Sequence, residues 1–241
     1  AYRRQRQMCI RDSLCGMTCP EIKAIFAPEL QALAVQTETT YDNIVEQLTR
    51  QYDGYRFTPS KGFAPMYNPF SVLSALDKLR FGDYWFASGT PTFLVEILKR
   101  TDFDLRELDG IEVSSASLSD DRANISNPVP MLYQSGYLTI KSYDTEFRVY
   151  TLGFPNEEVK YGFLNFAAPF YTPVSSTDTT FYIGKFIREL RNGDVNAFLT
   201  RLNCFFADFP YELNSKTERH YQVVFYLVFK LMGQFLSLIH I

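Results

Sequence analysis

Two short patterns in the sequence contain residue types that bind metal ions. Asp102-Phe103-Asp104 is a D-x-D pair, a pattern that some metal-dependent transferases use, and its carboxylates suit divalent cations. Cys15 and Cys19 have a C-x3-C spacing, but His220 and the distant Cys204 cannot readily complete a tetrahedral zinc site. A polar loop and inert, reduced thiols are the simpler interpretations. We therefore predict no metal-ligating residues.

Acid–base and nucleophilic chemistry have equally little support. Glu157 and Glu158 are adjacent carboxylates after Pro155, and paired carboxylates can act as general acid and base. Their position in the first turn of an expected helix is explained more simply, because carboxylates interact favourably with a helix N-terminus. His220 has no accompanying Ser or Cys motif that would complete a nucleophilic triad, so we expect a structural histidine. We predict no catalytic residue set from these patterns.

The sequence also lacks the motifs of phosphate chemistry. It contains no G-x-x-x-x-G-K-[S/T] loop, whose backbone and lysine would hold the phosphates of a nucleotide. No apolar strand ends in Asp-Glu to hold Mg²⁺, and no paired carboxylates with a lysine follow Phe235 for metal-assisted phosphodiester hydrolysis. By itself the chain is expected to bind no cofactor and to be catalytically silent.

Composition indicates a folded protein. The 241 residues are 46% apolar and 16% aromatic, which provides ample material for a core. The formal charge of −3 gives no global reason to bind a polyanion. The longest apolar run, Val223–Phe229, is far shorter than the ~20 residues that span a membrane. We expect a cytoplasmic protein with reduced thiols and no membrane partner.

Local signals predict a mainly α fold, α+β at the margin. Thr40 is an expected cap for a helix over 41–52, and Asn68-Pro69 and Thr90-Pro91 are expected to begin two more, the Asn68 helix ending near 81–82. The polar segment 102–128 is expected to be irregular, with a short strand at 111–113. A short helix at 131–134 and a helix opened by Pro155 follow from the same kind of signal.

One β-hairpin is predicted, with strands at 137–141 and 147–151. With the helices on either side it would form a winged-helix-like unit. Lys141 and Arg148 are balanced by Asp144 and Glu146, so the tip of the hairpin is close to neutral. A DNA-reading wing would carry an excess of basic residues. A packing or domain-coupling unit is therefore the favoured interpretation, with a DNA reader as the alternative.

Helices are again expected in the last quarter of the chain. Residues 173–180 form the expected linker, and a helical pair turns at Asn192-Gly193, with Asp194 capping its second helix. A last helix begins near Ser215. Its apolar residues over 223–235 surround it, which is typical of a helix buried on all sides. Either a missing sheet covers this helix, leaving it exposed in this chain, or the preceding pair already encloses it.

The two ends differ in character from the interior. Residues 1–13 and 236–241 resemble translated sequencing-adapter read-through of the kind found at the edges of assembled environmental sequences, and we expect neither to belong to the fold. The alternative is a native basic arm and a native C-terminal helix. Because residues 1–13 carry four basic residues and one acidic residue, setting them aside makes the remaining chain more acidic.

Five strings carry a resemblance to a known family. They are YDGYRF at 52–57, YNPFS at 67–71, YWFASGTPT at 84–92, YQSGYLTI at 133–140 and LGFPN at 152–156. In their order and spacing they resemble the bacterial AAA-ATPase-like proteins that end in a PD-(D/E)XK nuclease-type domain. The resemblance covers nearly all of the interior, from about Leu14 to Phe235.

This resemblance implies a domain organisation. Residues 14–172 would be the helical C-terminal part of the ATPase-like domain, 173–180 a linker, and 181–235 a helical linker with the start of the nuclease-like domain. The phosphate loop and the nuclease strands would lie outside this chain, so ATP and Mg²⁺ are implied for the longer protein only. Its ATPase core and nuclease sheet would be the partners of this segment, with nucleic acid as a further partner. Glu218 would match the extra acidic residue that some such nucleases place on their first helix, although a solvated glutamate at a helix start is the simpler interpretation.

Two functional hypotheses follow. In the first, the longer protein hydrolyses ATP and processes nucleic acid, and this internal segment couples its two domains. In the second, the segment is a non-catalytic protein-interaction or regulatory module.

Overall fold

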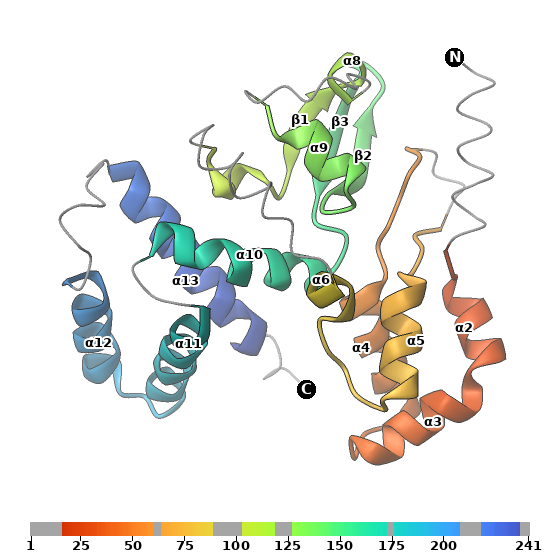
Figure 1. Ribbon diagram of the computed structural model, residues 1–241, viewed down its shortest axis with the longest axis horizontal. Helices are drawn as coiled ribbons and strands as arrows, with labels where there is room; N and C mark the ends of the chain where they lie inside the picture. Colours follow the sequence, from red (N-terminus) through yellow and green to blue (C-terminus); the bar gives the residue numbers. More distant parts are fainter. Residues whose placement is uncertain are drawn as a thin grey trace. The chain divides into compact units, whose positions relative to one another are not determined.

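The computed structural model describes residues 16–59, 64–88, 103–118, 127–172, 176–207 and 218–236 (Figure 1). The chain is mainly helical with one small antiparallel sheet, which confirms the predicted fold class. It divides into two compact units. The first comprises Ala1–Ile97 with Glu107–Lys160, and the second comprises Leu98–Arg106 with Tyr161–Ile241. This division falls inside helix α10 (Glu157–Tyr171), whereas the sequence placed the boundary near 173–180.

Short helices form the beginning of the first unit. They are α2 (Cys19–Ile25), α3 (Ala27–Gln36), α4 (Tyr41–Tyr52), α5 (Pro69–Asp77) and α6 (Tyr84–Ser88). Their apolar faces share one core, in which Leu30, Ile44 and Val72 are completely buried. The 3.6-residue spacing of Ile44, Val45 and Leu48 places all three on the buried face of α4, as the sequence predicts.

Caps define where α4 and α5 begin and end. The Thr40 hydroxyl accepts a hydrogen bond from the Asn43 amide at 3.3 Å, and the Asn68 side chain accepts one from the Phe70 amide at 3.0 Å. Both predicted caps are confirmed. However, α5 ends at Asp77, earlier than the predicted 81–82, because Leu79 adopts a left-handed conformation (φ 46°) and the Arg80 amide bonds back to the Ala75 carbonyl. This is a Schellman end formed without glycine, so no sequence signal marks it.

A three-stranded antiparallel sheet completes the first unit. Strands β1 (Ile111–Ser114), β2 (Thr139–Asp144) and β3 (Val149–Gly153) lie in the order β1-β3-β2, with short helices α8 (Ser115–Leu118) and α9 (Val129–Gln134) beside them (Figure 1). The hairpin and the strand near 111–113 are therefore confirmed. The hairpin strands lie about two residues later than predicted, because the Asp144 carboxylate accepts the Glu146 and Phe147 amides and fixes a turn over 145–148.

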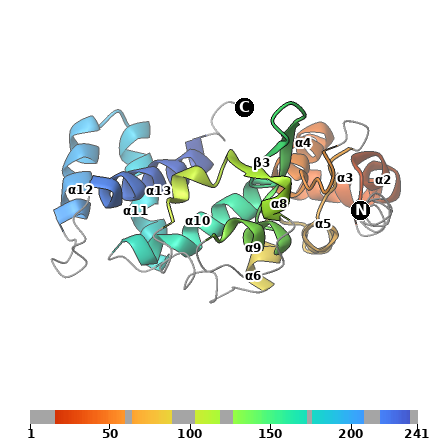
Figure 2. The ribbon, with the colours of Figure 1, turned by 90° about the horizontal axis from the view of Figure 1, so that it is seen from above.

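In the described part of the second unit lie helices α11 (Ser176–Arg191), α12 (Val195–Ala207) and α13 (Glu218–Leu236) (Figure 2). The short 3₁₀ turn Leu105–Glu107 lies at the border of this unit in the sequence. As predicted, Gly193 turns the chain at φ 72°, and the Asp194 carboxylate caps α12 by accepting the Ala197 amide at 2.9 Å. Residues 176–180 are helical, so the predicted linker is wrong over that stretch. Ser, Thr and Asp favour a helix start as readily as a loop, and composition alone could not separate the two.

Helix α13 is buried on one side only. Val224, Leu227 and Leu231 are buried, whereas Phe225 and Phe229 are 40% and 49% exposed. Phe225 packs against Phe206 of α12, with ring centroids 4.6 Å apart. The helical pair therefore does not enclose α13 completely, since an aromatic face is exposed. Its coverage by a sheet outside this chain stays a prediction.

Several predictions fall outside the described residues, namely the helix after Thr90-Pro91, residues 1–13 and residues 237–241. Leu236 is the last residue of α13. None of the helices in the described part of the chain combines the length and apolar character that a membrane crossing requires.

Candidate functional site

A pocket of about 410 Å³ lies in the first unit. Four of the five strings that carry the family resemblance contribute to it, although they are up to about 80 residues apart in the sequence. Its lining residues are Gly16, Tyr55, Phe57, Met66, Tyr67, Asn68, Pro69, Trp85, Gln134, Ser135 and Gly136. Segments that are far apart in the sequence thus come together around one cavity.

Backbone contacts bring these loops together. Met17 pairs with Tyr67, and Tyr55 pairs with Met66, as isolated antiparallel bridges. On the opposite side, Gly136 ends α9 at φ 82°, a conformation that suits glycine. A β-carbon there would lie 3.6 Å from the Trp85 ring, an ordinary van der Waals distance, so the backbone conformation rather than a lack of space favours glycine.

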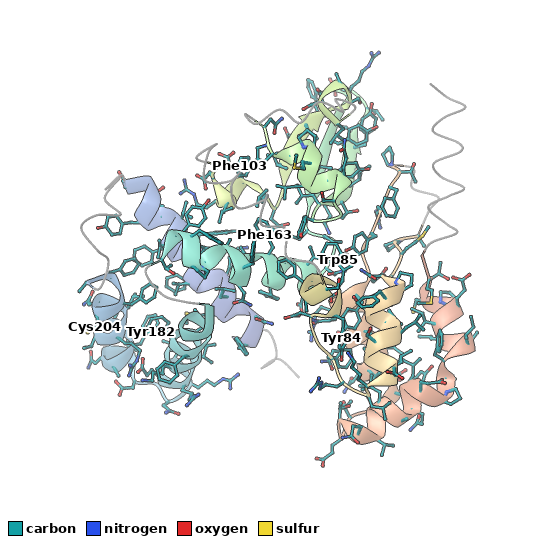
Figure 3. All side chains as sticks on the ribbon, viewed as in Figure 1. Tyr84, Trp85, Phe103, Phe163, Tyr182 and Cys204 are labelled. Carbon is teal, nitrogen blue, oxygen red and sulfur yellow. The ribbon has the colours of Figure 1, made fainter. Side chains whose placement is uncertain are left out.

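The pocket walls are mainly aromatic. Tyr55 and Tyr67 are buried, Phe57 is 45% exposed, and the Tyr55 and Phe57 rings stack with centroids 6.3 Å apart. Trp85, labelled on α6 in Figure 3, is supported from behind by Tyr137 at 5.3 Å in an edge-to-face contact. Burial raises the pKa of Tyr55 and Tyr67, and it raises that of Tyr137 to about 12. All three tyrosines are therefore neutral at physiological pH.

A buried carboxylate lies directly behind this wall. Glu158, in the first turn of α10, is 0% exposed. One of its oxygens accepts the Ser71 hydroxyl at 2.7 Å, and the other accepts the Trp85 amide, also at 2.7 Å. Burial raises the pKa of Glu158 to about 7, and the two hydrogen bonds partly oppose that rise. Glu158 thus connects α10 to α5 through Ser71 and to α6 through Trp85. Ser71 belongs to the YNPFS string, Trp85 belongs to the YWFASGTPT string, and Glu158 follows the LGFPN string by two residues.

The residues around Glu158 differ from it in environment. Glu157 points to Arg50 of α4, with a nitrogen–oxygen distance of 3.3 Å, and Lys160 pairs with Asp109 at 2.9 Å. From the sequence, Glu157 and Glu158 were interpreted together as carboxylates at a helix start. In the structure their roles differ: Glu157 is partly exposed and forms an ion pair with Arg50, whereas Glu158 is buried and holds α5 and α6 to α10. The neighbouring residues give no sequence signal for this difference, because Tyr161 lies three residues after Glu158 and four after Glu157 and so shares a helical face with both.

The structure gives structural roles to the described residues of the metal-like patterns. Asp104 is buried, and its carboxylate accepts hydrogen bonds from the Arg106 amide at 3.0 Å and from the Arg106 side chain. Cys19 begins α2 and packs against the core of the first unit. Asp102 and Cys15 lie outside the described residues. Within the described ranges, no group of three His, Cys, Asp or Glu residues is placed to hold a metal ion.

The residues singled out on α13 and at the hairpin do not join this pocket. Glu218 is exposed at the start of α13, where its carboxylate accepts the Gln222 side-chain amide at 3.0 Å. His220 lies in the same helical turn, and its side chain lies outside the described set. At the hairpin tip, Asp144 is used by the turn, and Arg148 adopts φ 56°. The role that the resemblance implies for Glu218 stays a prediction.

The chain is similar to a curated protein over most of its own length. No protein-family model matches the chain, and no solved structure matches it. Over 229 residues the chain is 30% identical to "Uncharacterized protein in vnfD 5'region" of Azotobacter chroococcum mcd 1. This alignment covers 92% of the chain and 41% of the relative. The chain thus spans about two fifths of the length of this curated relative.

Proposed function

We propose that this chain is a non-catalytic connecting segment of a longer protein that hydrolyses ATP and processes nucleic acid, and that α10 couples its two compact units. The ATPase-like and nuclease-like parts, with ATP and Mg²⁺ bound by the former, would be its partners along the same polypeptide. The observation that carries the coupling role is that α10 runs from one unit into the other. Its first turn belongs to the first unit, and Tyr161 onward belongs to the second.

Two further observations support this proposal. The first turn of α10 is attached within its unit by the Glu158 hydrogen bonds and the Arg50–Glu157 ion pair, while Phe163 and Leu164 in the second unit are completely buried. Because a helix forms cooperatively, a change that loosens one end is transmitted along it. In addition, the match to a relative more than twice as long suits a segment that works beside other domains.

Hydrogen exchange tests the coupling. Ser71→Ala removes the hydroxyl that donates to Glu158 and leaves a buried carboxylate oxygen without that partner, a loss of roughly 1–3 kcal/mol. We expect amides over 161–171 and 223–232, all in the second unit, to exchange faster in this variant.

A matched control separates coupling from general destabilisation. Thr49→Val removes another hydroxyl contact in the first unit, the 2.6 Å contact between Thr49 and Tyr67. The Thr49 hydroxyl bonds to the Val45 carbonyl and to Tyr67, neither of which belongs to α10. This variant should speed exchange within the first unit only. If Ser71→Ala also leaves exchange after residue 160 unchanged, the coupling proposal is wrong.

A second function, a protein-interaction module, is favoured by one observation. Phe225 and Phe229 stack on the exposed side of α13 with ring centroids 6.2 Å apart, and Leu199 of α12 is also exposed. Exposed apolar clusters of this kind mark contact surfaces. Under this alternative, α13 would bind a separate protein, and the second unit would act without the first.

A further inference from the structure

We propose that the aromatic pocket of the first unit binds a small alkylated ammonium cation. This proposal does not depend on the coupling role of α10, because it concerns only the pocket and the groups behind it.

The walls are rich in aromatic rings. Tyr55, Phe57, Tyr67 and Trp85 contribute four aromatic rings to a single cavity of about 410 Å³. Cations within about 6 Å of an aromatic ring face are attracted by its negative quadrupole, most strongly by tryptophan. An ammonium group covered with methyl groups gains this attraction and also buries apolar surface against the rings.

The lining disfavours anions. Among the described residues that line the pocket, none is Lys, Arg or His, and none is Asp or Glu. The N-terminus of α5 reaches the pocket at Asn68 and Pro69, but its first amides already donate to the side-chain oxygen of Asn68, the Phe70 amide at 3.0 Å and the Ser71 amide at 3.4 Å. A phosphate or carboxylate would thus be desolvated there without basic partners, which is costly.

Two carboxylates lie behind the walls. Glu158 accepts a hydrogen bond from the backbone amide of Trp85. Burial raises the pKa of Tyr55, and the negative charge of Glu158 raises it further. The pKa of Tyr67 is raised by burial and also by the negative charge of Asp53. The positive charge of Arg56 partly offsets the electrostatic field of Asp53. The field that disfavours a tyrosinate in these walls favours a cation in the pocket.

The Glu158 charge should make the affinity depend on pH. The Ser71 hydroxyl and the Trp85 and Tyr84 amides stabilise its ionised form, and the Asp83 carboxylate opposes ionisation. The hydroxyls of Tyr52 and Tyr55 also lie near it. Glu158 ionises as pH rises through about 7, so cation binding should tighten between pH 6 and pH 8.

The chain contains its own reporter, because Trp85 is its single tryptophan. We expect choline chloride to cause a saturable change in tryptophan fluorescence in the millimolar range. The matched probe is 3,3-dimethylbutan-1-ol, which has the same shape as choline without its charge. It should bind much more weakly. Equal binding of the two compounds, or no saturable change with choline, would overturn the proposal.

Variants locate the effect. Phe57→Ala removes a half-exposed wall and should weaken choline binding roughly fivefold, the loss of about one cation–π contact. Phe147→Ala, at the exposed hairpin tip outside the lining, is the control and should bind normally. Glu158→Gln should weaken binding at pH 8 and remove its pH dependence. Choline would be shown to bind elsewhere if its affinity for Glu158→Gln depended on pH as in the wild type and its affinity for Phe57→Ala were normal.

Discussion

At the residue scale, the sequence predicts the helical position of Glu158 correctly but does not predict that its side chain is buried. Its type, its position after Pro155 and its place in a helical first turn were all predictable. Its burial was not, because the partners that make burial tolerable are a serine 87 residues earlier and a backbone amide 73 residues earlier. A buried carboxylate is tolerated only with such partners, and here it retains a raised pKa.

Because of that raised pKa, the stability of the first unit should depend on pH. In the unfolded chain the pKa of Glu158 returns to about 4.5, so between 4.5 and about 7 the folded chain keeps a proton that the unfolded chain loses. The free energy of unfolding should therefore decrease as pH rises across this interval, by up to about 3 kcal/mol. Chemical denaturation at a series of pH values measures it.

Glu158→Gln separates this effect from other groups, including Glu157 and Asp53, whose pKa values burial also raises. The amide can accept the Trp85 N–H and donate to Ser71, as the protonated carboxyl does. The variant should match the wild type near pH 5 and exceed it in stability near pH 8. Parallel pH profiles for the two proteins would contradict the assignment of the effect to Glu158.

At the element scale, the sequence predicted starts better than ends. Thr40, Asn68 and Asp194 are caps whose side chains act within three residues, so local reasoning finds them. The end of α5 depends on a left-handed Leu79, and the hairpin register depends on a turn held by Asp144, neither of which residue type alone specifies. Close packing between distant loops is equally invisible in the sequence.

Gly54 provides a test of such close packing. It adopts φ 109° just after α4, and a β-carbon there would lie 2.1 Å from the Pro155 carbonyl oxygen. Gly110, in the same unit, adopts a similar φ of 114° with nothing within 4 Å. Gly110→Ala should therefore cost only backbone strain, roughly 1–3 kcal/mol. Gly54→Ala should cost clearly more, because the backbone of two loops must separate.

Equilibrium denaturation of both variants gives the comparison. Both variants should lose a similar free energy of unfolding through backbone strain. The additional loss in Gly54→Ala therefore measures the contact between the YDGYRF and LGFPN strings. Equal losses would mean that this contact does not constrain the loops.

At the scale of the whole molecule, the fold class followed from the sequence, but the division into units did not. Polar composition suggested a boundary at 173–180, whereas the chain divides by packing at Lys160 and Tyr161, inside a continuous helix. The helical pattern of apolar residues continues unchanged across this boundary, so the pattern cannot reveal where one unit ends and the next begins. Likewise, the strings that gather around the pocket are separated by whole helices, and only the folded chain shows that they meet.

The coupling of the two units is tested most directly by unfolding the chain while each unit is observed separately. Trp85 reports on the first unit, and a dye on the exposed thiol of Cys204 reports on the second, after Cys9, Cys15 and Cys19 are replaced by serine or alanine. If α10 couples the units, fluorescence from both probes should change at the same denaturant concentration, as in a cooperative transition. Two separate transitions, with Trp85 and the dye changing at clearly different midpoints, would contradict the coupling.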